Sequence, residues 1–333
     1  MTKNYFDHEI KHQVDLIRAE AGEMRRIRRI LSEADNKIDV MLRVKGDLPR
    51  HGTKAFQRMV DRILKIRAEA MTEIRRELTD DLRRLADIER TFEIRALKNL
   101  SPITSPIDVH LNTLRSKVFS TPFSTSPGQM ANFDAWVKSL AAADARRIEE
   151  AMVSASRTGQ DARRLLIGTR SSKFTDGLLY RTVRNTDTVV RTSFTHLSST
   201  VRDTGWEAND GIIAYRWTAM LDRKLCPICL SHHGRYIPAN GRTLPKGLPP
   251  VQPPGLRPTL HANCRCILVP VFSLDGLLDL PTSDEWLMAQ SGSVQDSVLG
   301  LTRAKLFREG KIEASALTNQ LGRLITLDQL AEL

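Results

Sequence analysis

Two long stretches near the start of the chain repeat apolar residues at spacings of three and four. The first covers residues 5–43 and the second residues 53–97, and charged residues occupy their other faces. Apolar residues at this period form a stripe along one side of an α-helix. Residues 44–52, which contain two glycines and a proline, separate the two stretches. The pattern therefore predicts an antiparallel hairpin of two long amphipathic helices over residues 1–98.

The pattern changes at residue 99. Residues 99–131 repeat Ser-Pro and Thr-Pro and carry few charges. Because proline disfavours the helical conformation in the residue before it, this segment is not expected to sustain a helix. We interpret it as a Ser/Thr/Pro-rich linker and as a domain boundary. Its apolar residues leave open whether it is held on a surface or is loose.

Helical spacing resumes in the second part of the chain, over residues 133–156, 161–167 and 176–204. Residues 212–220 alternate and are rich in aromatic residues, so they predict a β-strand. A second strand is expected at residues 267–272, paired with the first in a small sheet. The region between the strands is rich in proline and glycine and predicts a long irregular loop.

The last segment of the chain again favours helices, over about residues 284–289, 293–309 and after residue 326. Together the patterns predict a mainly α protein (α+β class) with four parts. After the hairpin and the linker come a domain at residues 132–275, with a small β element, and a helical tail at residues 276–333.

All four cysteines of the chain lie close together in this β region. Cys226 and Cys229 form C-P-I-C, and Cys264 and Cys266 follow His261 in H-A-N-C-R-C. Two such clusters about thirty residues apart can close a tetrahedral zinc site. Five candidate ligands compete for four positions. The two residues of C-P-I-C are favoured, together with two or more of the other three, and the spacing does not choose among those.

A structural zinc site is favoured over the alternatives. Disulfides require an oxidising compartment, and the chain opens with M-T-K-N-Y-F-D-H, without an apolar signal segment. Buried thiols without a metal are disfavoured by the pairing of two clusters. No Asp or Glu lies between Asp222 and Asp275 to serve as a general base, which argues against a catalytic metal.

Three neighbouring residues complete this expectation. Asp222 is expected to accept hydrogen bonds from backbone amides of the Cys226 turn and so to orient the thiolates. His232 and His233 follow the first cysteine pair, and we interpret them as exposed turn residues rather than ligands.

Residues 217–236 read W-T-A-M-L-D-R-K-L-C-P-I-C-L-S-H-H-G-R-Y, and residues 258–270 read P-T-L-H-A-N-C-R-C-I-L-V-P. This order resembles the Mu F-like family of phage head morphogenesis proteins. The shared pattern is a Trp, an Asp, C-x2-C, a short turn that ends in Gly and an aromatic residue, and H-x-N-C-R-C before an apolar strand. One departure is His233-Gly234, where the family usually has Asp-Gly. The resemblance covers about residues 132–275.

The resemblance implies a minor head protein of a tailed phage, present in multiple copies in the virion. Such a protein would lie inside the capsid or at the portal vertex, bound to the portal or the major capsid protein, after assembly in the host cytoplasm. The resemblance implies metal binding and not an enzyme. No run of 18 apolar residues occurs, so no membrane span is expected.

The charge balance adds double-stranded DNA as an expected partner. The chain has 50 Lys and Arg against 39 Asp and Glu, a net charge of +11. Residues 223–274 carry seven basic residues and no acidic one, and a basic excess attracts phosphates. Solubilising charge explains the excess equally well. The basic residues singled out for DNA contact are Arg235, Arg242, Lys246, Arg257 and Arg265.

Two other functions fit parts of the pattern. An HNH-like zinc nuclease would use His232, His233, His261 and Asn263 among the cysteines, but no carboxylate and no second C-x2-C completes such a site. A zinc-ribbon DNA-binding regulator would need a recognition helix with a basic face beside the cysteine pair, and none is predicted there.

Overall fold

The computed structural model of the chain describes residues 2–46, 48–126, 129–168, 177–239, 241–274, 280–319 and 321–331. Within them helices predominate, and strands form a two-stranded hairpin and a three-stranded antiparallel sheet. The predicted class, mainly α with a small β element, is confirmed. None of the helices described is both long enough and apolar enough to cross a membrane.

The chain divides into two compact units. Unit 1 comprises Met1–Val14, Ala86–Val118 and Thr195–Leu333, and unit 2 comprises Asp15–Leu85 and Phe119–Phe194. Long helices pass from one unit into the other, so the units are built from discontinuous stretches. The domain boundaries predicted at residues 98, 131 and 275 stay a prediction, and the last of them lies outside the described residues.

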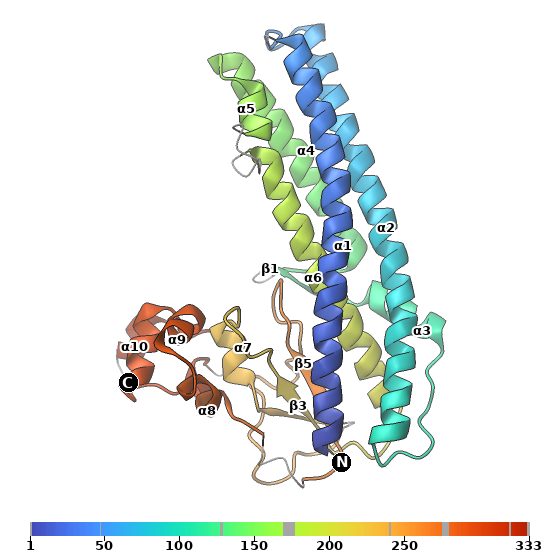
Figure 1. Cartoon of the computed structure of the whole chain (residues 1–333), viewed down its shortest axis with the longest axis vertical. Helices are drawn as coiled ribbons and strands as arrows, with labels where there is room; N and C mark the ends of the chain where they lie inside the picture. The colour runs from blue at the N-terminus through green and yellow to red at the C-terminus, as the bar shows by residue number, and fades with distance from the viewer. Residues whose placement is uncertain are drawn as a thin grey trace. The chain divides into compact units, whose positions relative to one another are not determined.

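The N-terminal hairpin is present as predicted. Helices α1 (Thr2–Lys45) and α2 (Lys54–Leu100) run side by side in opposite directions (Figure 1). Their buried positions recur with helical spacing, as the sequence pattern required. These positions include Ile27, Leu31 and Ile38 on α1 and Ile63, Ile74 and Leu78 on α2.

Unit 2 adds two helices and the first part of a third to the hairpin. These are α4 (Phe133–Thr158), α5 (Ala162–Ile167) and α6 (Leu178–Glu207). The side chains of Asn132 and Asp161 accept hydrogen bonds from backbone amides at the starts of α4 and α5, which satisfies donors that the helix itself leaves free. The core of this unit includes Ile38, Ile63, Ile148, Met152 and Leu166.

The predicted linker contains regular structure. Helix α3 (Leu111–Ser120) lies within it, followed by the hairpin of β1 (Phe123–Ser126) and β2 (Gln129–Ala131). The expectation that residues 99–131 sustain no helix was therefore wrong. The prolines of the segment fall outside α3, and Leu114 and Val118, one helical turn apart, are buried.

The three-stranded sheet has the order β4-β3-β5 and belongs to unit 1. Strand β3 (Ala214–Thr218) pairs antiparallel with β5 (Ile267–Val271), which confirms the predicted pairing. Strand β4 (Tyr236–Pro238), also antiparallel to β3, was missed because three residues carry too little pattern. The short helix α7 (Pro227–His232) lies between β3 and β4. Trp217 on β3 is fully buried, as expected for a core residue.

The tail is helical, as predicted, with one difference. Its helices are α8 (Ser283–Met288), α9 (Gly292–Leu299), α10 (Leu301–Arg308) and α11 (Leu327–Ala331). The single helix expected over residues 293–309 is divided at Gly300, whose backbone has φ 78°. Glycine adopts this conformation without the steric cost that a side chain would bring, so the chain bends there.

Candidate metal centre

The first cysteine pair is built on the start of α7. Cys226 is the N-cap residue of this helix, and its Sγ accepts a hydrogen bond from the backbone amide of Cys229 at 3.3 Å. Pro227 occupies the first helical position, where its missing N–H has no helical partner to lose and its fixed φ suits the helix. The expected tight turn is therefore the first turn of a short helix, and both sulfur atoms belong to it.

The second ligand segment is a tight turn that leads into β5. The backbone amide of Cys264 donates to the carbonyl of His261 at 3.1 Å. Asn263, between them, has φ 62°, a left-handed conformation that asparagine tolerates better than most residues. The Nδ1 atom of His261 lies 2.8 Å from the carbonyl oxygen of Ala262, so a proton on Nδ1 leaves Nε2 free to bind a metal.

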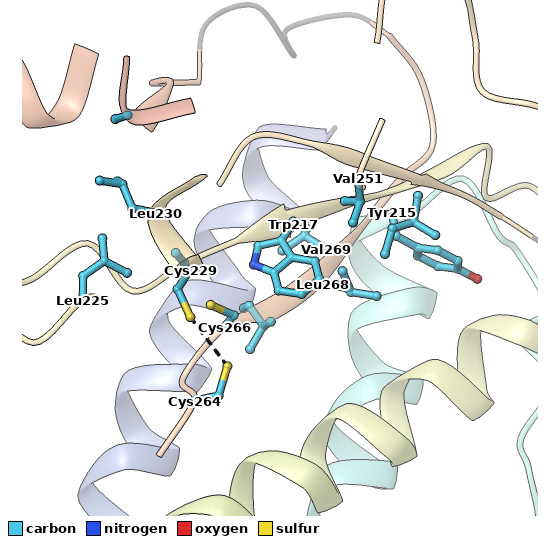
Figure 2. Close-up of a cluster of buried hydrophobic side chains, with 14 of the residues drawn as sticks. Tyr215, Trp217, Leu225, Cys229, Leu230, Val251, Cys264, Cys266, Leu268 and Val269 are labelled. Carbon is cyan, nitrogen blue, oxygen red and sulfur yellow. Dashed lines mark hydrogen bonds between the residues drawn. The ribbon is translucent and has the colours of Figure 1, made fainter. Parts of the chain in front are cut away.

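The two segments bring all five candidate ligands together. The Nε2 atom of His261 lies 3.2 Å from the Sγ atoms of both Cys226 and Cys229, and the Sγ atoms of Cys229 and Cys264 are 3.9 Å apart. Figure 2 shows the contact between the sulfur atoms of Cys229 and Cys264 as a dashed line, and Cys266 beside Trp217. Ligands of one tetrahedral zinc ion are separated by about 3.8 Å between sulfurs and about 3.5 Å between sulfur and nitrogen.

The ligands form two groups that could each hold a metal ion. One consists of Cys226, Cys229 and His261, and the other of Cys229, Cys264 and Cys266. Within a group the donor atoms lie within 4.8 Å of one another. Cys229 belongs to both groups and is therefore the residue on which any metal in this cluster most depends. All four cysteines are free thiols, so the sulfur atoms are available as ligands.

Electrostatic coupling within the cluster makes two of the four thiols easier to ionise and two harder to ionise. The contact with Cys229, and then the His261 ring, lowers the pKa of Cys226 to about 5. The contact with Cys226 is also the largest cause that raises the pKa of His261, to about 9. The pKa of Cys264 is lowered as well, first by its contact with Cys229. The pKa values of Cys229 and Cys266 are raised well above the usual value, that of Cys229 first by its contact with Cys226 and that of Cys266 by burial. Thiolates are the form that binds metals, so metal binding by this cluster would release protons.

Asp222 links the two ligand segments. Its carboxylate accepts two hydrogen bonds from the Arg265 guanidinium, at 2.5 and 2.7 Å, and another from the backbone amide of Lys224 at 2.8 Å. The pairing with Arg265, first of all, lowers the pKa of Asp222. The expected amide contact is thus made with the turn that precedes Cys226. The pairing with Arg265 was missed, although the opposite charges in the two motifs were a signal for it.

The two neighbouring histidines are not exposed turn residues, so that prediction was wrong. His232 and His233 are both buried, and the ring of His232 packs on Trp217 with the ring centroids 5.0 Å apart. The Nδ1 atom of His233 accepts a hydrogen bond from the Ala219 amide at 3.1 Å, and its Nε2 atom lies 3.2 Å from the Pro281 carbonyl. Burial lowers the pKa of His232 to about 4 and that of His233 to about 3. Both are neutral packing residues, and neither belongs to the two ligand groups.

Three of the five basic residues singled out for DNA contact form hydrogen bonds or ion pairs within the chain. Arg235 donates to the backbone carbonyls of Ser231, Pro250 and Ser315, and Arg265 binds Asp222 as described. Arg257 forms an ion pair with Asp203 at 2.9 Å. Their guanidinium groups stabilise unit 1. The exposed members of the set are Arg242 and Lys246.

A second metal-site pattern occurs near the N-terminus and was not anticipated. Residues 8–12 read H-E-I-K-H, the spacing at which two histidines on one helix face can bind zinc. In unit 1, however, both imidazoles stack on Phe92, and Glu9 pairs with the buried Arg202 at 3.2 Å. Among the described residues these side chains form no group of three close donors. The side chains of this pattern therefore pack α1 against α2 and α6 and are not arranged as metal ligands.

Comparisons of the chain with protein-family models, with curated proteins and with solved structures found no match. The function of the protein is therefore inferred from its own residues and their geometry. Of the features described, the Cys/His cluster is the one with the most distinctive chemistry.

Proposed function

We propose that the protein is a structural component of a tailed-phage virion, a minor head or head morphogenesis protein, in which the Cys/His cluster binds a structural zinc ion. The observation that carries the metal part is the convergence of two ligand segments, 32 to 35 residues apart, on one point. The virion part rests on the resemblance of these two segments to the Mu F-like pattern.

Zinc suits the donor set better than other common metals. The donors are thiolate sulfur and imidazole nitrogen, which zinc prefers in structural sites, whereas calcium and magnesium prefer oxygen. Zinc needs no redox partner and accepts tetrahedral geometry, which the close spacing of the donors permits. The sulfur atoms of Cys229, Cys264 and Cys266 belong to buried residues, and this supports a closed site without a position for substrate.

The proposed role of zinc is to stabilise the fold around the sheet. The ligand segments precede β4 and β5, and the chain between them is largely irregular. Closing a long irregular loop costs conformational entropy, and a metal that binds only the folded state offsets this cost. The protein would hold four of the five ligands on the ion, with His261 bound through Nε2.

The proposed partners are the portal or major capsid protein and, more weakly, packaged double-stranded DNA. The net charge of +11 supports DNA contact, but three of the five basic residues first considered are engaged inside the chain. Arg242 and Lys246 are exposed and are the remaining members for a phosphate contact. Many copies per virion, inside the head or at the portal vertex, would follow from the resemblance.

The nuclease alternative receives less support from the site. It requires accessible histidines as base or metal ligand, and His232 and His233 are buried against Trp217 and backbone groups. The zinc-ribbon alternative lacks a basic recognition helix, since α7 has six residues and no Lys or Arg. We therefore propose a structural and not a catalytic role.

The metal is tested by element analysis of the purified full chain. We expect about one zinc per chain and a lower melting temperature after chelation. His261→Ala should lose zinc, whereas His110→Ala, which removes an exposed imidazole elsewhere in unit 1, should keep it. A chain without metal whose melting is unchanged by a chelator would contradict the zinc proposal.

The virion role has its own test. Mass spectrometry of purified, nuclease-treated phage particles should detect the chain as a minor component. Its consistent absence from particles, with zinc still bound to the free protein, would contradict the virion role and leave the metal site intact.

A further inference from the structure

A groove with an apolar floor and basic walls lies on unit 2, between α1 and α2. Its floor consists of Val40, Met41 and Val44 from α1 and Ile66 from α2. Its walls include Lys37 on α1 and Arg62 on α2, and none of the described residues that line it is acidic. The groove is distant in sequence from the Cys/His segments and plays no part in the proposed metal site.

The floor is unusually exposed for apolar residues on a long helix. Val40 is 60% exposed and Val44 is 82% exposed, although the same helix buries Ile38 and Leu42. Valine is a weaker helix former than alanine, lysine or glutamate, because its branched side chain is restricted in the helix. Val40 and Val44 are exposed and one turn apart, so they stabilise α1 no better than alanine, lysine or glutamate would at the same positions. Contact with another helix gives them a use.

The charges of the walls indicate what that helix carries. Lys37 and Arg62 are both exposed, and neither takes part in an ion pair within the described part of the chain. Other arginines nearby are paired, for example Arg43 with Asp39 at 2.8 Å and Arg67 with Asp35 at 2.5 Å. The two cations at the groove are thus free to meet carboxylates of a partner.

We infer that this groove binds an amphipathic helix of a partner protein, with an apolar stripe and acidic flanks. The residues of α1 that line it span nine positions, from Asn36 to Val44, or about 12 Å of helix. Two to three turns of an incoming helix cover that length. Its apolar stripe would meet the valines, its acidic residues would meet Lys37 and Arg62, and Met41 would adapt to the shape of the incoming side chains.

Two other occupants fit less well. A second copy of this chain, docked by the same face, would oppose Lys37 and Arg62 to their own counterparts, and like charges at close range repel. Nucleic acid would use the cations but has no need of an exposed apolar floor. An acidic amphipathic helix uses both the floor and the walls.

The test uses the full chain and two synthetic helical peptides of about 18 residues, five turns. Both carry leucines at helical spacing; one has glutamates on its flanks and the other has lysines. We expect the acidic peptide to bind and the basic peptide to bind at least about tenfold more weakly, measured by fluorescence anisotropy. Equal binding of the two peptides, or no binding of the acidic one, would overturn the proposal.

Variants of the groove sharpen the test. Lys37→Glu with Arg62→Glu should weaken the acidic peptide about tenfold and strengthen the basic one. Arg146→Glu with Arg181→Glu, the same charge change at exposed positions of α4 and α6, should alter neither. Val40→Ser with Val44→Ser should weaken the acidic peptide by about a hundredfold through lost apolar burial, and helix propensity changes little.

Two outcomes would assign the groove to another occupant and overturn the inference. One is a dimer of the chain in light scattering that Val40→Ser with Val44→Ser dissociates. The other is DNA binding that Lys37→Glu with Arg62→Glu abolishes while the serine variants leave it unchanged, with no acidic-peptide binding in either case. Circular dichroism of each variant should match the parent, since all four altered side chains are exposed.

Discussion

The two units each bury a cluster of charged side chains, and they balance it differently. In unit 2 the side chain of Arg67 is 2% exposed and forms ion pairs with Asp35 at 2.5 Å and with Asp144 at 2.9 Å. A second arginine, Arg147, lies 3.7 Å from Asp144. Among the described residues of unit 1, one guanidinium, that of Arg202, faces three buried carboxylates, those of Glu9, Glu89 and Glu93. Unit 2 therefore pairs two acids with two arginines, and unit 1 has an excess of acid.

In unit 1 the raised pKa of Glu93 favours its neutral form near pH 7, which reduces the excess of negative charge. Glu93 receives hydrogen bonds from Tyr5 and Trp206, and burial raises its pKa to about 8, with further help from the nearby Glu9. The pKa of Glu89 shifts in the opposite direction. Burial alone would raise it, but the hydrogen bond with His12 and the charge of Arg202 outweigh burial and lower it. The comparison teaches that a buried acid stays ionised only where enough donors and cations face it.

The largest effect is expected from breaking the balanced cluster. Arg67→Met leaves the buried Asp144 and the half-buried Asp35 without their main cation, and removal of one partner of a buried pair costs about 3–5 kcal/mol. Urea denaturation followed by circular dichroism measures the loss in the free energy of unfolding. Arg146→Met, an exposed arginine on α4, is the matched control and should change it by less than about 0.5 kcal/mol.

The same variant can be rescued if charge balance is the cause. Arg67→Met combined with Asp144→Asn removes a buried negative charge as well and should recover part of the lost stability. If the double variant is less stable than Arg67→Met alone, packing and the hydrogen bond from Thr182 to Asp144 matter more than the charge.

The acid-rich cluster should make unit 1 sensitive to pH. A carboxyl group whose pKa is raised in the folded state binds its proton more tightly when folded, so its stabilising contribution is lost as pH rises. For Glu93 the loss begins near the ordinary value of 4.5 and is complete near 8. Glu89, with a lowered pKa, keeps its contribution over this range and loses it only in more acidic solution. Stability should therefore fall between about pH 5 and about pH 8.

Glu93→Gln separates this effect from other titrations. The amide is neutral at every pH, so the melting temperature of this variant should fall less between about pH 5 and about pH 8 than that of the parent. Glu73→Gln, at an exposed position of the same helix, should leave the slope of the parent unchanged. The same pH slope in Glu93→Gln and the parent would show that Glu93 is not the group that holds the proton.

The sequence predicted the elements with long periodic patterns and missed contacts that depend on distant residues. The apolar stripes of α1 and α2 could be predicted because each repeats over ten or more residues. The pairing of β3 with β5 could be predicted because both strands are apolar runs. The helix α3 was missed because the prolines around it masked a short helical repeat. Burial of Leu114 and Val118, a tertiary effect, decides its structure.

The same distinction holds for the candidate site. The C-x2-C and H-x-N-C-R-C spacings were enough to predict that the two Cys/His segments meet, since each motif fixes its own local geometry, but not which four of the five candidates would bind a metal. The burial of His232 and His233 was not predictable in this way, because it depends on Trp217 and on the carbonyl of Pro281, 48 residues beyond His233. Likewise, a count of basic residues cannot tell Arg265, which is paired, from Arg242, which is exposed.

The smallest effect is expected at the ion pair beside the Cys/His cluster, where solvent reaches the charges. The side chain of Asp222 is 45% exposed and that of Arg265 is 17% exposed, in contrast to Arg67 at 2%.

Asp222→Asn should therefore cost less than about 1 kcal/mol of unfolding free energy, because water and salt screen the pair. Because Asp222 connects the segments that carry Cys226 and Cys264, the same variant should release the proposed zinc ion to a chelator somewhat faster than the parent. Asp210→Asn, at an exposed acid of the same unit, should match the parent in both measurements. If Asp222→Asn lowers the free energy of unfolding as much as Arg67→Met does, solvent access does not determine how much each charged pair contributes to stability. The contrast between buried and half-exposed pairs would then be wrong.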